Sequence, residues 1–199
     1  MAYRVKMIHN IMNHNVIHAR EFMLEIFLEK VSEELRRAGY QVNTRPQIPG
    51  VQGLLYARTP ARIQVGVAKI EDHFLFIDWD NTLFGHLELV KETYKRFSSE
   101  VNKGFKVPHA WRVQMPNLAV IAISRGAFPE EAVNFARSTN LGPWYGGETG
   151  QLMLVNLELQ NLTAMQTFSI NHRPRYGALP LAHAVDVIRE VCDWAFMQV

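Results

Sequence analysis

The chain has 199 residues, of which 48% are hydrophobic and 20% are charged, a balance typical of a globular protein with a buried core. A formal net charge of +2 at pH 7 neither requires nor excludes a nucleic-acid partner. The longest purely apolar run, residues 118–123, is too short to cross a bilayer, so no membrane partner is expected. With a single cysteine, Cys192, and no apolar signal segment near the start, the expected location is the cytoplasm. Charge blocks and repeats are absent from the sequence, which predicts a single domain over residues 1–199.

The first predicted element is a helix over residues 15–38. Apolar side chains recur there at steps of three and four residues, at Leu24, Leu28, Val31, Leu35 and Ala38. This spacing places them on one face of a helix. Gly39 follows directly and suits the position after a helix end.

Strands are predicted next. A short one covers residues 40–44, and three more cover residues 51–58, 62–70 and 73–80. Turns of hairpin length separate the last three, at Thr59-Pro60 and at Glu71-Asp72. Because turns of this length join antiparallel neighbours, these strands are expected to form an antiparallel meander.

The second half of the chain alternates helices and strands. Predicted helices run from Leu87 to Gly104, from Pro129 through Ala136, and from about Pro180 onwards. Predicted strands cover residues 118–124, 151–160 and 165–170. Since a strand, a helix and a second strand usually form a parallel crossover, the expected fold class is α/β, with a mixed central sheet flanked by helices.

Two carboxylates follow the apolar run at residues 74–77 and are the leading catalytic candidates. Residues 76–83, Phe-Ile-Asp-Trp-Asp-Asn-Thr-Leu, resemble the first motif of the haloacid dehalogenase phosphatases. That resemblance implies that Asp78 is a nucleophile forming an aspartyl-phosphate and that Asp80 is a general acid/base. It also implies that Mg²⁺ neutralises the phosphate.

A second resemblance covers most of the chain. A helix, a three-stranded meander, a helix and a strand form the core order of the restriction-endonuclease-like, or PD-(D/E)XK, superfamily. Residues 118–136, Leu-Ala-Val-Ile-Ala-Ile-Ser-Arg-Gly-Ala-Phe-Pro-Glu-Glu-Ala-Val-Asn-Phe-Ala, resemble the late strand and helix of its Mrr and archaeal resolvase branch. This resemblance implies a mixed sheet between helices.

The resemblance also implies a nuclease site, with an acidic residue on one strand and Glu/Asp/Gln-x-Lys on the next. In such a site the carboxylates bind Mg²⁺ and the lysine helps to activate water. Here the third strand of the predicted meander ends in Asp78-Trp79-Asp80 without a lysine, and residues 51–58 contain no carboxylate. The active-site motif is therefore degraded, with Lys69 as the nearest substitute for the lysine.

We therefore expect a non-catalytic nucleic-acid-binding or interaction protein, whose partners would be DNA, RNA, another protein or a second copy of the chain. Candidate nucleic-acid contacts lie in two loops, at Trp144 in the glycine-rich residues 142–150 and at Arg173, Arg175 and Tyr176. One alternative is a Mg²⁺-dependent nuclease with a rearranged site of Asp78, Asp80 and Lys69, in which the two aspartates bind the metal. The other is a dehalogenase-type phosphatase that uses Asp78.

Overall fold

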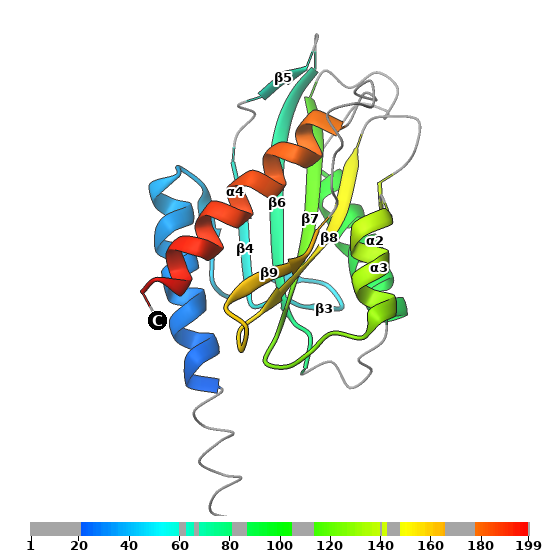
Figure 1. Cartoon of the computed structure of the whole chain (residues 1–199). Coiled ribbons are helices and arrows are strands. Elements are labelled where there is room, and N and C mark those ends of the chain that lie inside the picture. Colours follow the sequence, from blue (N-terminus) through cyan, green and yellow to red (C-terminus); the bar gives the residue numbers. More distant parts are fainter. Residues whose placement is uncertain are drawn as a thin grey trace, which may run out of the picture.

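A computed structural model describes residues 21–59, 63–65, 68–80, 87–104, 114–139, 141–142, 148–165 and 178–198. It shows an α/β fold in which helices cover both faces of a mixed central sheet (Figure 1). The chain is helical over residues 21–37. The elements that follow are β1 (Gln41–Asn43), β2 (Gln47–Ile48), β3 (Val51–Gln52), β4 (Leu55–Arg58), β5 (Ile63–Val65), β6 (Ala68–Asp78), α2 (Leu87–Asn102), β7 (Gln114–Ser124), α3 (Glu130–Ser138), β8 (Thr149–Asn156), β9 (Asn161–Ala164) and α4 (Ala178–Phe196).

The central sheet has the strand order β1-β4-β6-β7-β8-β9, and β5 pairs with the start of β6. Its middle strands β6, β7 and β8 are parallel, whereas β1, β4 and β9 run antiparallel to their neighbours. Helix α2 connects β6 to β7, and α3 connects β7 to β8. The predicted strand–helix–strand crossover and the mixed α/β sheet are therefore confirmed.

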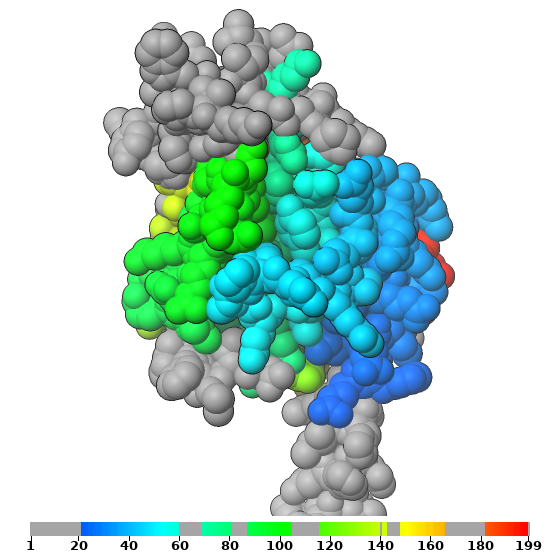
Figure 2. Space-filling model, turned by 180° about the vertical axis from the view of Figure 1, so that it is seen from behind, coloured from blue at the N-terminus to red at the C-terminus, as the bar shows by residue number. Residues whose placement is uncertain are grey.

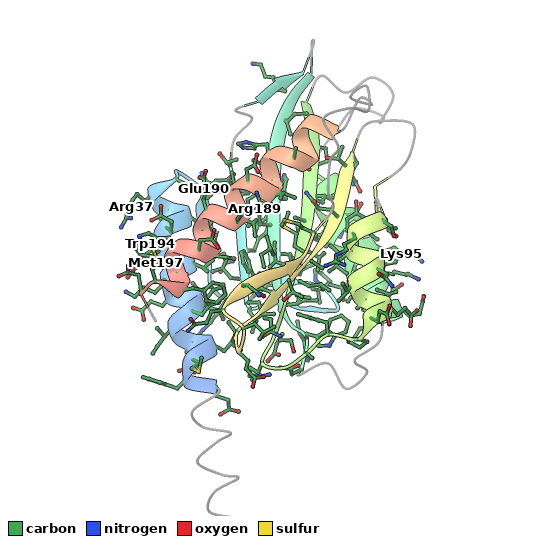
Figure 3. All side chains as sticks on the ribbon, viewed as in Figure 1. Arg37, Lys95, Arg189, Glu190, Trp194 and Met197 are labelled. Atoms are coloured by element: carbon green, nitrogen blue, oxygen red, sulfur yellow. The ribbon has the colours of Figure 1, made fainter. Side chains whose placement is uncertain are left out.

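Alternating side chains of the parallel strands build two core layers. One layer packs against the helix at residues 21–37 and against α4, and it includes Phe74, Phe76, Ile121 and Met153. The other packs against α2 and α3 and includes Leu75, Ile77, Val120 and Leu152. On the outside of the first layer, the Arg37 guanidinium lies 5.0 Å from the ring centroid of Trp194, which joins the first helix to α4 (Figure 3).

A small hairpin of β2 and β3 lies apart from the central sheet and packs on α2. Its turn contains Gly50, whose φ of 71° is in the left-handed region that favours glycine. Arg96 of α2 donates a 3.0 Å hydrogen bond from Nη1 to the Gly50 carbonyl. A Cβ at position 50 would lie 2.0 Å from that nitrogen, so glycine also permits the close approach of the arginine.

The predicted turn at Glu71-Asp72 is wrong. Both residues lie inside β6, which runs without interruption from Ala68 to Asp78. The predicted strand at residues 51–58 is also divided, because β3 pairs with β2 while only β4 joins the central sheet. The antiparallel section is formed by β1, β4 and β6. In the sequence, two adjacent acidic residues resemble an exposed turn. Asp72 can be buried inside the strand because Tyr40 and Asn117, which are distant in the sequence, donate hydrogen bonds to it.

Other predicted boundaries differ by smaller amounts. Gly39 has a φ of 86° and follows the first helix as expected. The strand predicted at residues 151–160 ends at Asn156, and the next strand begins at Asn161. Residues 166–170 of the last predicted strand lie outside the described part of the chain. None of the described helices combines the length and the apolarity needed to cross a membrane.

Candidate functional site

Asp78 and Asp80 lie at the carboxyl end of β6, where the parallel neighbour β7 also ends. The Nη2 atom of Arg125 is 2.7 Å from both carboxylate oxygens of Asp78, and its Nε atom is 3.0 Å from Oδ2 of Asp80. Asp80 also accepts hydrogen bonds from the Ser124 hydroxyl at 2.8 Å and from the Arg125 amide at 2.7 Å. One arginine therefore bridges the two candidate catalytic carboxylates.

The electrostatics of this cluster favour a closed ion-pair network. Burial alone would lower the pKa of the Arg125 guanidinium, but the hydrogen bond to Asp80 and the charges of both aspartates outweigh it and raise that pKa. The side chains of Arg125 and Asp78 are only 18% and 11% exposed. A metal ion that bound both carboxylates would have to displace this guanidinium.

Lys69 does not join this cluster. It lies near the start of β6, nine positions before Asp78 on the same strand. At a rise of about 3.3 Å per residue, the two are separated by roughly 30 Å. The structure thus brings Asp78 and Asp80 together but places the third member of the predicted catalytic set at the opposite end of the sheet.

The predicted nucleic-acid contacts Trp144, Arg173, Arg175 and Tyr176 lie outside the described residues. Within the part that the structure does describe, no group of three or more His, Cys, Asp or Glu side chains is arranged to hold a metal ion. The described geometry thus offers Mg²⁺ no preformed set of three such ligands.

A row of buried polar side chains crosses the three parallel strands at another level. Asp72 of β6, Asn117 of β7 and Thr149 of β8 are adjacent in register. Asn117 donates to Asp72 at 2.7 Å and accepts from the Thr149 hydroxyl at 2.7 Å, while Tyr40 donates to Asp72 at 3.0 Å. Burial raises the pKa of the Asp72 carboxyl, although the hydrogen bond from Asn117 and the nearby His183 oppose that shift. The hydrogen bonds of this row therefore provide donors for the buried Asp72 carboxyl group.

Another buried carboxylate, Glu148, attaches the start of β8 to α2. It accepts hydrogen bonds from the Tyr94 hydroxyl, the Ser98 hydroxyl and the Asn102 side-chain amide. Burial and then the charge of Glu148 raise the pKa of Tyr94, so this tyrosine is a protonated donor at neutral pH. Three side chains of α2 thus donate to one buried carboxylate, which is typical of a structural role.

Odd-numbered residues of β6 face α2, and there they line a pocket of about 460 Å³. Glu71 and His73 contribute from β6, and Tyr56 and Arg58 contribute from the neighbouring β4. The Tyr56 oxygen is 2.6 Å from Nδ1 of His73, and Oε1 of Glu71 is 3.3 Å from Nε2 of the same ring. A carboxylate, an imidazole and a phenol therefore line one concave site of a volume common for small-molecule pockets.

Sequence reasoning missed this constellation because it placed a turn at Glu71-Asp72. A signal was nevertheless present. From residue 70 to residue 77 the even positions Ile70, Phe74 and Phe76 and the odd positions Leu75 and Ile77 form two apolar sets, as in a strand buried on both faces. An uninterrupted strand would have placed Glu71 and His73 on one face, two residues apart.

Comparison with known proteins gives no relative for this chain, since no protein-family model, no curated protein and no solved structure matches it.

Proposed function

We propose that this chain is a restriction-endonuclease-like domain that binds nucleic acid without cleaving it. Support for the architecture comes from the order of the elements. A helix precedes the antiparallel strands β1, β4 and β6, and α2 then leads to the parallel strand β7. This agrees with the helix, meander, helix and strand core that the sequence resembles.

The observation that carries the non-catalytic part of the proposal is the bridge from Arg125 to both aspartates. A carboxylate nucleophile or metal ligand needs an oxygen lone pair directed at its substrate or ion. Here the guanidinium contacts both oxygens of Asp78, and Asp80 accepts three further hydrogen bonds. Asp78 and Asp80 then stabilise the ends of β6 and β7 instead of performing chemistry.

A second feature agrees with an altered nuclease site. The family resemblance expects Glu-x-Lys on the third strand of the meander, opposite an acidic residue on the second. The third strand of the observed sheet carries Glu71-Asp72-His73, so a histidine stands two residues after the glutamate. Tyr56 and Arg58 of β4, rather than a carboxylate, lie beside that pair in the pocket.

The proposal is tested by measuring binding and cleavage on the same preparation. Fluorescence anisotropy would follow labelled single-stranded and duplex DNA and RNA at about 50 mM and about 200 mM salt. Binding that weakens as salt rises is expected, because phosphate contacts release counterions. No binding to any of the four probes at the lower salt would remove the nucleic-acid role.

Cleavage is assayed with plasmid DNA and with p-nitrophenyl phosphate, each in the presence of Mg²⁺ or Mn²⁺. The expected result is no turnover of either substrate. Plasmid cleavage that Asp78→Ala abolishes would favour the rearranged nuclease, and a covalent phosphate analogue on Asp78 would favour the phosphatase. Either outcome would overturn the proposed function.

A pair of double variants locates the contact. Replacing Arg173 and Arg175 by alanine is expected to weaken binding to all sequences alike and to reduce the salt dependence by about two phosphate contacts. The matched control replaces the exposed Arg36 and Arg137, which lie on the first helix and on α3. Equal losses for the two double variants would contradict a contact at the loop.

A further inference from the structure

The pocket beside β6 has apolar side chains on both walls and on its floor. Ile48 lines it from the β2 side, Val101 from α2 and Tyr56 from β4, and all three are partly exposed. Figure 2 shows this side of the molecule, with α2 in green and residues 40–58 in blue to cyan beside it. Because Arg96 of α2 donates a hydrogen bond to the hairpin turn, the two walls are fastened to each other.

Three cationic side chains surround the end of this pocket that lies toward the start of β6. Arg58 lines the pocket, and Lys103 directly precedes the lining residue Gly104. Lys69 lies on the same face of β6 as the lining residue Glu71, two positions earlier, because side chains alternate along a strand. All three cations are exposed. Together, Arg58, Lys69 and Lys103 form what we call the basic rim.

Two carboxylates also line the pocket, and each of them has a partner. Glu100 forms an ion pair with Lys103, one helical turn away on α2. The side chain of Glu71 is only 16% exposed, and its Oε1 atom lies 3.3 Å from Nε2 of His73. These carboxylates therefore offset the charge of one member of the basic rim and leave two uncompensated.

Arg58 and Lys69 are the two uncompensated cations. Among the residues that the structure describes, neither has a carboxylate within ion-pair distance. Arg58 donates from Nε to the side-chain oxygen of Gln41 at 2.9 Å, which holds the guanidinium in place. Both of its Nη atoms remain as donors, and a guanidinium presented in this way suits the oxygens of a phosphate.

The charge of the surrounding chain favours a polyanion at this rim. From Lys103 the sequence continues into residues 105–113, which contain two cations and two aromatic residues but no acidic residue. At the opposite end of β6, the aspartates Asp78 and Asp80 share a single arginine. A polyanion is therefore attracted to the basic rim and repelled from the carboxyl end of β6.

We propose that the basic rim binds the phosphates of a single-stranded nucleic acid, one of whose unpaired bases enters the pocket. The pocket volume of about 460 Å³ accommodates a small flat ring. Ile48, Val101 and Tyr56 contact the ring by shape and stacking, so every base is accepted. A paired base inside a duplex cannot enter. This inference rests on the proposed nucleic-acid binding and names both the kind of nucleic acid and the surface that holds it.

A triple variant tests the basic rim. Replacing Arg58, Lys69 and Lys103 by alanine is expected to weaken binding of an oligothymidylate of about ten nucleotides by about tenfold or more. The slope of log K against log salt should fall by about two, because each phosphate contact on a single strand contributes about 0.7. Since all three side chains are exposed, the urea midpoint of the variant should stay near that of the parent.

The matched control replaces Lys30, Arg36 and Lys95 by alanine. It removes the same charge, and Lys30 is paired with Glu33 as Lys103 is paired with Glu100. Lys95 lies on the outer side of α2, away from the sheet (Figure 3). The control should keep nearly the affinity and the salt slope of the parent. Equal losses in the two triple variants would overturn the basic rim as the binding surface.

The base contact is tested with strands that keep the phosphates but lack bases. An abasic strand of the same length is expected to bind the parent about tenfold more weakly than oligothymidylate, and a duplex should also bind more weakly than the single strand. Equal affinity for the intact and the abasic strand, or tighter binding of the duplex, would overturn the entry of a base.

A second pair of variants locates that base. Ile48→Asp places a charge inside the pocket, so the preference for the intact over the abasic strand should be lost. Val51→Asp changes the partner of Ile48 in the same hairpin, which does not line the pocket, and should keep the preference. The preference is a ratio of two affinities of one protein, so a general loss of stability does not imitate the effect. An unchanged ratio in Ile48→Asp would exclude the pocket.

Inorganic polyphosphate separates this inference from the proposed function. If oligonucleotides bind but the rim variant and its control lose affinity equally, the inference fails while the proposed function stands. If no oligonucleotide binds the parent, the proposed function and the base contact both fail. Binding of polyphosphate to the parent and not to the rim variant would then still support the rim as a phosphate-binding surface.

Discussion

At the scale of single residues, Arg125 determines what the two prominent carboxylates can do. In the parallel register Asp78 is opposite Ile123, which places Ser124 and Arg125 beside Asp80. The sequence shows the carboxylates but not their proximity to this arginine, since 45 residues separate Arg125 from Asp80. If β6 and β7 are known to be parallel neighbours that end together, however, the pairing can be predicted. Arg125 follows β7 directly and therefore lies close to the two aspartates at the end of β6.

Arg125→Ala is expected to lower the free energy of unfolding by about 2 kcal/mol, between the cost of losing a surface ion pair and a buried one. The reason is that Asp78 and Asp80 would be left close together without their shared cation. Urea unfolding at neutral pH measures the change. Arg137→Ala, exposed on α3, is the control and should alter stability by less than about 0.5 kcal/mol. An equally small change for Arg125→Ala would mean that the bridge is not structural.

Asp72 makes stability depend on pH in an unusual direction. Its pKa is raised above the ordinary value of 3.8, with burial as the largest cause. Between that ordinary value and the raised one, the folded protein binds more protons than the unfolded chain. Its contribution to the free energy of unfolding is therefore largest at acid pH and falls as pH rises through the folded pKa, by at most about 1.4 kcal/mol per pH unit.

The comparison that isolates this effect is between the parent and Asp72→Asn, unfolded in urea from about pH 4 to about pH 7. Since asparagine does not titrate, the free energy of unfolding of the parent minus that of the variant should decrease as pH rises. Asp186→Asn, at a side chain that is 65% exposed, serves as the control. A parent-minus-variant difference that stays constant with pH would contradict the raised pKa.

At the scale of elements, β6 is the strand on which both faces of the fold depend. Phe74 and Phe76 point into the layer with the first helix and α4, whereas Leu75 and Ile77 point into the layer with α2 and α3. The apolar half of this strand was predictable from its sequence. Its polar half was not, because Asp72 bonds to Tyr40 and Asn117, and Nδ1 of His73 bonds to Tyr56. The folded sheet alone brings these partners together.

Phe74→Ala should cost about 3 to 5 kcal/mol, since it removes a fully buried ring that stacks on Tyr40 and leaves a cavity. Phe22→Ala is the matched control on the first helix, where the side chain is 62% exposed and a change within about 0.5 kcal/mol is expected. Chemical denaturation of both variants measures the two losses. Similar losses at the two positions would contradict the assigned layers.

At the scale of the whole molecule, the order of helices and strands was largely predictable, because an amphipathic helix or a buried strand is specified by its own residues. The continuous apolar run of β7 indicated burial on both faces, and the parallel crossover from β7 to β8 followed from the alternation of elements. Local patterns do not specify which polar groups meet across the sheet. For that reason the Arg125 bridge and the pocket of Tyr56, His73 and Glu71 emerged only from the fold.

Global stability also reports whether Mg²⁺ binds the folded protein at Asp78 and Asp80. An ion that bound only the native state at a concentration about one hundred times its dissociation constant would raise the free energy of unfolding by about 2.7 kcal/mol. Because Arg125 already contacts oxygens of both carboxylates, we expect the urea midpoint to be the same in Mg²⁺ and in EDTA at matched ionic strength. The same titration on Arg125→Ala is the informative contrast, since removing the guanidinium leaves two carboxylates for the ion and should make that variant gain stability in Mg²⁺. A Mg²⁺-dependent rise in the parent that Asp78→Asn abolishes would instead identify a metal site in the native protein and return the nuclease and phosphatase alternatives to first place.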